Sequence, residues 1–332
     1  MTQTPATLLL ARGDIMRIMT TADYLVAADE VFAAAAAGKA SSPQPMHLPA
    51  KRGGFHAKGA CLSLERDYVA VKINGNFPAN PAELGRPTIQ GVIFLADASN
   101  GDILAILDSI EVTLRRTAAA SALAARRLAK PESHVLLVCG CGEQGRAHAV
   151  ALREVMPLKR LLLWDRNREA AETLASELTS ATQIDAIAVT ELPDASRSAD
   201  VIATCTTARE PFLGPGLVAP GTFIAAVGAD NPDKSEIAPS LMATATVVAD
   251  VVEQCAVMGD LHHAIEARLM SKEDVYAELT EVVAGAKGRR SPEEIIIFDS
   301  TGTGLLDVAS AAAIYRRCAS VTDIRSIELA EG

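Results

Sequence analysis

The sequence predicts an α/β fold: a Rossmann-type, doubly wound parallel sheet together with a second, discontinuous α+β domain. Three observations lead to this class. From Val135 onward, short apolar runs alternate with helical stretches, which is typical of βαβ units and a parallel sheet. A glycine-rich turn follows the first of these runs. Before Val135, strand-like and helix-like segments are mixed without that alternation.

Length and composition fit two domains. The chain has 332 residues, and domains average roughly 150 residues. Apolar residues make up 49% and aromatic residues only 4%, so the core is expected to consist of Ala, Val, Leu and Ile, as where helices pack on a parallel sheet. Because an Ala-rich helix at about 305–319 can return to the first domain, we expect residues 126–304 to form the Rossmann domain and residues 1–125 plus 305–332 the other.

Charge and cysteine usage restrict the partners. The net charge is −10, so the surface repels nucleic acid and anionic lipid. No apolar run is long enough for a transmembrane helix, and the N-terminus lacks the features of a signal peptide. The six cysteines form neither a zinc spacing nor a disulfide framework. We therefore expect a cytoplasmic protein with reduced thiols, no metal, no nucleic acid partner and no membrane partner.

The first region is predicted to be an α+β unit. Its expected elements are a helix at 21–40, strands at 68–73, 89–97 and 102–108, and a long Ala-rich helix at about 111–129. Residues 42–60 are rich in Pro and Gly and are expected to form a basic loop, and a turn is expected at 74–76, where Asn-Gly-Asn follows a strand.

The second region is predicted to supply the parallel strands. The apolar runs that should form them lie at 135–138, 161–164, 201–204, 223–227, 246–250 and 295–298. The strongest motif of the chain, Gly-Cys-Gly-Glu-Gln-Gly at 140–145, follows the first run and precedes a helix, which is the context that a dinucleotide-binding turn requires.

Each glycine of this motif has a physical role. Gly140 permits the tight turn, Gly142 lets the backbone approach a pyrophosphate, and Gly145 lets helix and strand pack closely. The N–H groups of the following helix then face the phosphates. We expect this turn, including Glu143 and Gln144, to bind the cofactor.

The residue at the end of the second strand indicates which cofactor is bound. Asp165 lies twenty residues beyond Gly145, where a carboxylate bonds ribose hydroxyls and repels a 2′-phosphate. NAD is therefore expected, and NADP is less favoured, although Arg166 could accept a 2′-phosphate. We also assign four residues near other strand ends to the cofactor site: Thr204, Thr206, Gly228 and Thr303.

Several further segments, taken together, resemble the ornithine cyclodeaminase/mu-crystallin family, which includes alanine dehydrogenases and cyclic-imine reductases. The matching stretches are VKINGNFPAN at 71–80, PTIQGVIFLADASNG at 87–101, TLRRTAAASALAAR at 113–126, the glycine turn at 140–145, AVGADNPDKSEI at 226–237 and FDSTGTGLLD at 298–307. The resemblance implies a homodimer formed through the first domain and a loop at 300–304 near the nicotinamide. It also implies that Lys72 and Arg116 hold the substrate carboxylate and that Asp230 handles protons at the reacting nitrogen.

The chemistry agrees with these residue types, since Lys and a forked Arg fix a carboxylate well and a carboxylic acid can protonate an imine nitrogen. Each role also has a simpler alternative. Lys72 could be a solvated strand lysine, Arg115 rather than Arg116 could point inward, and Asp230 could cap a helix beginning near Pro232. His148 and the pair at 262–263 are expected to be surface or packing residues.

The chain departs from the cyclodeaminase branch in residues 44–60. That branch carries a glutamate for the far amino group of ornithine, whereas this segment contains no acid and has His56 at that position, with the cations Lys51, Arg52 and Lys58 and the second histidine His47. Such a pocket should accept a second carboxylate. The alternative is that these side chains form a solvated loop face.

The leading hypothesis is therefore an NADH-dependent reductase of a small imino acid, with iminosuccinate, which gives aspartate, as the best substrate. The second hypothesis is an alanine dehydrogenase or a cyclic ketimine reductase that uses a monocarboxylic substrate. An ornithine cyclodeaminase is less favoured, and so is a non-enzymatic binding protein like mu-crystallin, because Lys72, Arg116 and Asp230 are all present.

Overall fold

A computed structural model describes residues 6–182 and 184–329 of the chain. The chain forms two compact units: the first runs to Thr117 and resumes at Thr303, and the second comprises Ala118–Gly302. The first boundary lies eight residues before the expected one, within helix α4 (Ser109–Leu128). The early part of α4 contacts helix α12 of the first unit through Arg116, whereas Ser121 contacts His148 of the second unit.

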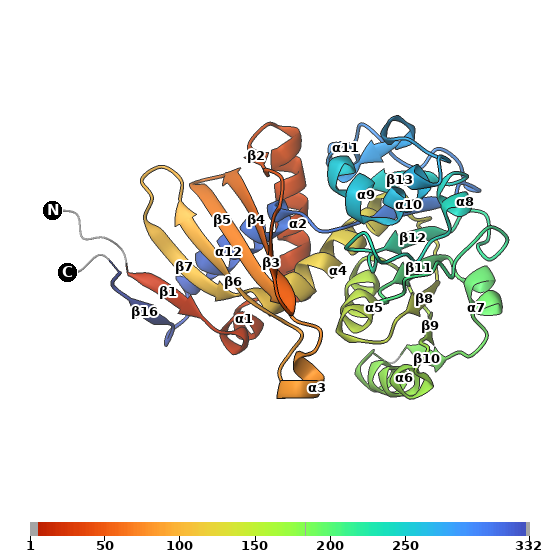
Figure 1. Cartoon of the computed structure of the whole chain (residues 1–332), viewed down its shortest axis with the longest axis horizontal. Helices are drawn as coiled ribbons and strands as arrows, with labels where there is room; N and C mark the ends of the chain where they lie inside the picture. Colours follow the sequence, from red (N-terminus) through yellow and green to blue (C-terminus); the bar gives the residue numbers. More distant parts are fainter. Residues whose placement is uncertain (1–5, 183, 330–332) are drawn as a thin grey trace. The chain divides into compact units, whose positions relative to one another are not determined.

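The first unit contains a mixed sheet in the strand order β16-β1-β7-β6-β5-β4-β2, with β3 paired to β4 (Figure 1). Only the β1–β7 pair is parallel. The strands are β1 (Thr7–Leu10), β2 (Ala40–Ser41), β3 (Met46–Ala50), β4 (Gly53–Ser63), β5 (Asp67–Asn76), β6 (Ile89–Asp97), β7 (Ile103–Asp108) and β16 (Arg325–Ile327).

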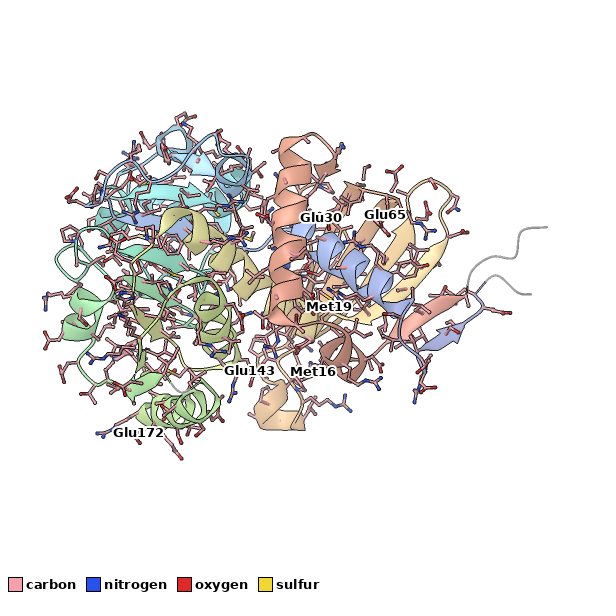
Figure 2. The ribbon with its side chains drawn as sticks, turned by 180° about the vertical axis from the view of Figure 1, so that it is seen from behind. Met16, Met19, Glu30, Glu65, Glu143 and Glu172 are labelled. Atoms are coloured by element: carbon pink, nitrogen blue, oxygen red, sulfur yellow. The ribbon has the colours of Figure 1, made fainter. Side chains whose placement is uncertain are left out.

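One face of this sheet is covered by helix α12 (Gly304–Cys318), which lies across β4, β5 and β6 (Figure 1). The other helices of the unit are α1 (Arg12–Ile18), α2 (Thr21–Ala36), α3 (Asn80–Leu84) and the start of α4. Arg316 of α12 forms ion pairs with Glu30 of α2 at 2.8 Å and with Glu65 of the β4–β5 turn at 3.3 Å. Figure 2 shows both glutamates beside the same stretch of α12.

The segment at 42–60 corrects the sequence-based expectation of a loop, because it forms the β3–β4 hairpin. Pro49 is tolerated there because β3 pairs on one side only. The turn expected at 74–76 is also wrong, since β5 continues through Asn76. Gly75 serves close packing instead, because a Cβ there would lie 2.9 Å from the Phe55 ring.

The second unit contains an eight-stranded sheet in the order β10-β9-β8-β11-β12-β15-β13-β14, all parallel. The strands are β8 (Val135–Cys139), β9 (Arg160–Trp164), β10 (Asp185–Ala188), β11 (Val201–Thr204), β12 (Phe223–Ala226), β13 (Thr246–Ala249), β14 (Ala277–Glu278) and β15 (Ile296–Asp299). The predicted α/β fold class is confirmed. The sheet reverses its order between β8 and β11, where Rossmann-type sheets bind ligands.

Helices cover both faces of this sheet, so β11, β12, β13 and β15 are buried along their whole length. These helices are α5 (Glu143–Val155), α6 (Arg168–Thr182), α7 (Leu192–Ser198), α8 (Pro239–Met242), α9 (Val252–Met258), α10 (Asp260–Glu266) and α11 (Leu279–Val283). Across residues 6–182 and 184–329, no helix combines the length and the apolar character needed to cross a membrane.

Candidate active site

Three charged side chains meet inside the first unit. The Lys72 Nζ on β5 donates to Asp307 Oδ1 on α12 at 2.9 Å, and the Arg116 Nε on α4 donates to the same oxygen at 3.1 Å. Lys72 also lies 3.3 Å from the Thr113 hydroxyl. The exposed fractions are 5% for Lys72, 4% for Arg116 and 1% for Asp307. We call these three residues the carboxylate cluster.

Successive side chains of β5 point to opposite faces of the sheet, and this explains why Lys72 is buried. Ala70 and Lys72 point to the face covered by α12, whereas Val71 and Ile73 point to the other face. The alternative of a solvated strand lysine is therefore wrong. On α4, Arg115 instead pairs with Glu111 and remains partly exposed, so Arg116 is the inward residue, as predicted.

The carboxylate cluster carries more positive than negative charge. Burial, followed by repulsion from Arg116, lowers the pKa of Lys72 to about 7. Burial opposes ionisation of Asp307, but the nearby Lys72 and Arg116 outweigh it and lower the pKa of this carboxyl group. Because two buried cations share one buried anion, the site can accept a second carboxylate from a ligand.

Asp307 escaped the sequence analysis. Its partners lie 235 and 191 residues away in the chain, so no local spacing reveals them. The composition of α12 offers a signal for Asp307, which is the one acidic residue in a helix otherwise rich in Ala and Leu, a composition typical of buried helices. An aspartate is almost never fully buried unless it is paired, so Lys or Arg side chains are its expected partners.

The basic residues of the β3–β4 hairpin divide into two groups. Lys58 pairs across the sheet with Lys72, and its charge contributes to lowering the pKa of both Lys72 and Asp307. His56 lies two residues along the same strand, hence on the same face, and its Nδ1 is 3.3 Å from the Nδ1 of His47.

Arg52 belongs to the second group. It lies at the hairpin turn, exposed, and its guanidinium is paired with Glu83 of α3. A ligand could therefore reach the Arg52 guanidinium only in competition with Glu83. Lys51, which precedes it, is exposed as well.

The second unit contains a cavity of about 730 Å³ at the carboxyl ends of β8, β9 and β11. Five of the residues assigned to the cofactor line it: Gly140, Gly142, Asp165, Arg166 and Thr206. The rest of the lining consists of Trp164, Asn167, Cys205, Thr207, Ala208, Arg209, Glu210 and Phe212. Of the other assigned residues, Gln144 and Gly145 lie in the first turn of α5.

The glycine turn has the geometry that phosphate binding requires. Gly140 has a φ of 97°, and a Cβ on Gly145 would lie 1.9 Å from the Gly140 carbonyl oxygen. Gly142 has open space around its Cα and begins α5 without a side-chain cap, so the first N–H groups of the helix are available to an anion. Glu143 is exposed at this end of α5 (Figure 2).

Asp165 connects the end of β9 to the glycine turn. Its Oδ2 accepts a hydrogen bond from the Cys141 N–H at 2.7 Å and its Oδ1 accepts one from the Asn167 N–H at 2.8 Å. The carboxylate lines the cavity and remains partly exposed. This is the position from which an acid can bond ribose hydroxyls.

A second acid missed from sequence, Glu236, joins the ends of β11 and β12. It is fully buried and accepts hydrogen bonds from the N–H groups of Thr206 at 2.6 Å and Gly228 at 2.8 Å. Burial, followed by the nearby Asp260, raises the pKa of Glu236 to about 7. A Cβ on Gly228 would lie 2.5 Å from this carboxyl group, which explains the glycine.

The remaining assigned residues lie in both units. Asp230 follows β12, is exposed and pairs with Lys234 at 2.7 Å. No helix begins near Pro232, so the alternative of an N-cap is wrong. Thr204 is buried at the end of β11, and Thr303 caps α12, its hydroxyl accepting from the Leu305 N–H at 3.2 Å.

Comparisons with known proteins extend over nearly the whole chain. A sequence model of the ornithine cyclodeaminase/mu-crystallin family matches residues 6–322. An archaeal alanine dehydrogenase, a dimer with bound NAD, is 33% identical with a TM-score of 0.93, and the match covers 98% of this chain and 100% of that one. The iminosuccinate reductase of Paracoccus denitrificans, in complex with NAD⁺, is 30% identical with a TM-score of 0.92 over 98% and 100%. Ketimine reductase mu-crystallin of Mus musculus is 35% identical over 80% of this chain and 81% of its own length.

Proposed function

The chain belongs to the ornithine cyclodeaminase/mu-crystallin family, and we propose that it reduces a small imino acid to an amino acid with NADH. It is an oxidoreductase of the class that acts on C=N and CH–NH₂ groups with a nicotinamide cofactor, as its relatives are. The observation that carries the proposal is the carboxylate cluster, in which buried Lys72 and Arg116 share the single carboxylate of Asp307.

The substrate carboxylate binds to the excess positive charge of this cluster. Arg116 offers a planar fork of N–H donors and Lys72 a point charge, the two groups that hold a carboxylate in a fixed orientation. Bound there, the carboxylate also favours the charged form of Lys72, so the protonated lysine and the ligand stabilise each other.

The reaction needs one hydride and one proton. Gly140, Gly142 and the first N–H groups of α5 would hold the pyrophosphate of the cofactor, whose nicotinamide would supply the hydride for the imine carbon. Asp230 would handle the proton that the imine nitrogen gains as C=N becomes CH–NH. Asp165 favours NADH over NADPH, because its carboxylate repels a 2′-phosphate.

A second carboxylate on the substrate fits the side chains next to the cluster. Lys58, His56 and His47 extend along the sheet face that carries Lys72, and this segment contains no acid. We therefore propose a dicarboxylic substrate, iminosuccinate, which is reduced to aspartate. Arg52 takes part only if its ion pair with Glu83 opens.

A monocarboxylic substrate is the second candidate. The relatives named alanine dehydrogenase and ketimine reductase favour it, since they are 33% and 35% identical to this chain and the iminosuccinate reductase is 30% identical. In that case the basic hairpin residues would be solvated, and the carboxylate cluster alone would hold the substrate.

We also propose that the protein is a homodimer formed through the sheet of the first unit. The sheet face opposite α12 exposes large apolar side chains: Met46 at 53%, Leu48 at 49%, Phe55 at 40%, Ile73 at 43% and Val92 at 45%. They occupy adjacent positions on β3, β4, β5 and β6. An exposed apolar patch of this kind marks a protein interface, and the archaeal relative is a dimer.

The free thiols favour the cytoplasm as the compartment. All six cysteines are unpaired, and thiols persist in this form in reducing compartments. We therefore propose a cytoplasmic location.

The test measures the oxidation of NADH, by its absorbance, with each member of a substrate panel. Oxaloacetate, pyruvate, glyoxylate and 2-oxoglutarate are each supplied with excess ammonium, and preformed iminosuccinate and a cyclic imine are added to the panel. Turnover confined to the four-carbon dicarboxylate supports the full proposal. Turnover of pyruvate or of the cyclic imine instead supports the monocarboxylic alternative, and binding of NADH without turnover of any substrate contradicts both.

A further inference from the structure

Three potential metal ligands lie together on helix α10 of the second unit. The His262 Nε2 is 3.5 Å from Glu266 Oε2, and the His263 Nδ1 is 4.0 Å from the same oxygen. One ligand atom from each side chain lies within 4.8 Å of the other two. From the sequence alone, the two histidines are expected to be surface or packing residues.

The hydrogen bonds of the two imidazoles determine which nitrogen is available. The His262 Nδ1 is 3.3 Å from the Ala256 carbonyl oxygen, and the His263 Nε2 is 2.8 Å from the Lys234 carbonyl oxygen. A carbonyl oxygen only accepts, so these two nitrogens carry the hydrogens. In the neutral imidazoles, the lone pairs are therefore on the His262 Nε2 and the His263 Nδ1, the two atoms that approach Glu266.

This arrangement brings two lone pairs and a carboxylate together with no hydrogen between them. Three acceptors at such distances repel one another unless a proton or a metal cation lies among them. Backbone carbonyls that orient the outer nitrogens of histidine ligands are also a common feature of metal sites. Both observations point to a cation in the space among the three side chains.

We propose that His262, His263 and Glu266 bind a divalent transition metal of the zinc class. Two imidazole nitrogens and one carboxylate oxygen are a donor set that Zn²⁺ accepts, with water in the remaining position. Ligand atoms at about 2.0–2.1 Å from a tetrahedral Zn²⁺ lie about 3.4 Å apart. The two imidazole nitrogens lie 3.5 and 4.0 Å from the Glu266 oxygen and all three atoms lie within 4.8 Å of one another, so the side chains must move closer together around an ion. The side chains are 20%, 21% and 65% exposed, so an ion can reach them from solvent.

The site is separate from the carboxylate cluster and does not depend on the proposed function. It connects α10 to the segment that precedes Glu236, because His263 bonds the Lys234 carbonyl. An ion bound by three side chains of this one helix would stabilise the folded state, so metal binding should raise the melting temperature.

The experiment uses the full chain without a polyhistidine tag, stripped with a chelator and dialysed. Co²⁺ is titrated while its visible absorption is followed, and Zn²⁺ is titrated by calorimetry. We expect one Co²⁺ per chain, displaced by Zn²⁺. Since loss of even an outer-shell partner weakens metal sites by roughly 10–100-fold, His262→Ala, His263→Ala and Glu266→Gln should each weaken binding by at least about 100-fold.

Two controls keep the result interpretable. His134→Ala removes a histidine whose Nδ1 contacts the Pro157 carbonyl, outside the cluster, and should leave the titration unchanged. Glu266 is mostly exposed, so Glu266→Gln should fold normally, which circular dichroism checks. Absence of a stoichiometric site, its persistence in Glu266→Gln and His262→Ala, or its loss in His47→Ala would each overturn the proposal, the last by placing the metal at the other histidine pair.

Discussion

The two units bury carboxyl groups in opposite ways. In the first unit, Asp307 is in contact with Lys72 and Arg116 and its pKa is lowered. In the second unit, Glu236 and Asp260 are held by N–H and O–H donors, and burial raises the pKa of these groups to about 7 and about 6. Asp299 accepts a hydrogen bond from the Leu261 N–H, and burial raises the pKa of this carboxyl group as well.

The difference indicates different roles. A buried acid among cations remains ionised and leaves a charged site that a ligand can complete. A buried acid with no cation beside it tends to keep its proton, because burial outweighs the donors around it, and it holds backbone segments in place. The first arrangement is typical of a binding site, and the second of a structural connection between strand ends.

The largest expected effect comes from Asp307→Asn. It leaves Lys72 and Arg116 buried without a counter-charge, which should lower the free energy of unfolding by about 3–5 kcal/mol. Urea denaturation measures this. As a control, Asp185→Asn breaks the exposed pair with Arg160 and should cost less than about 1 kcal/mol. Equal losses in the two variants would remove the distinction between the units.

A smaller loss is expected for Glu236→Gln. The amide has one acceptor oxygen, so either Thr206 or Gly228 loses its partner, at a cost of about 1–3 kcal/mol. The pKa of Glu236 is higher in the folded state than its ordinary value of 4.5, so its proton stabilises the fold at low pH and this contribution is lost as the pH rises toward about 7.

The pH dependence therefore tests the comparison. The stability advantage of the wild type over Glu236→Gln should shrink between about pH 5 and about pH 8, because the glutamine does not titrate. Urea denaturation at several pH values measures it. An advantage that is constant, or that grows with pH, would mean that Glu236 is ionised like Asp307.

His56→Ala should act on the substrate rather than on the fold. If His56 binds the distal carboxylate, the KM for the dicarboxylate should rise roughly tenfold, near the lower end of what a hydrogen bond to a charged group contributes. The KM for a monocarboxylic substrate should be unchanged. A similar rise in KM for both substrates would show that His56 does not bind the second carboxylate.

The smallest effect is expected for Arg52→Ala. The side chain is exposed and paired with Glu83, and exposed pairs contribute at most about 1 kcal/mol, so the KM for the dicarboxylate should change by less than about fivefold. Steady-state kinetics beside those of His56→Ala checks this. A change as large as that of His56→Ala would place Arg52 at the distal carboxylate.

Most of the fold could be predicted because local patterns determine it. The fully buried strands of the second unit appear as short apolar runs, and the glycine turn that follows β8 has a steric reason for each glycine. The β3–β4 hairpin could not be predicted this way, because its Pro and Gly residues are typical of loops. On the neighbouring strand β5, Gly75 is required by contact with Phe55 of the hairpin, which is remote in sequence.

The candidate site was predicted in part. The resemblance to the family predicts the roles of Lys72 and Arg116. Asp307 and Glu236 were missed, because an acid gains its role from partners on other strands and helices. The pairing of Arg52 with Glu83 could not be foreseen for the same reason, since α3 lies 31 residues further along the chain.

The central claim is that Lys72, kept partly neutral by burial, must be protonated to bind the substrate carboxylate. The most direct measurement is the pH dependence of kcat/KM for the wild type and for Lys72→Arg on the same substrate. The wild-type value should fall as the pH rises above about 7, the pKa of Lys72, whereas the arginine variant, which remains charged, should keep its activity to higher pH. Profiles that fall at the same pH in both proteins would contradict the claim.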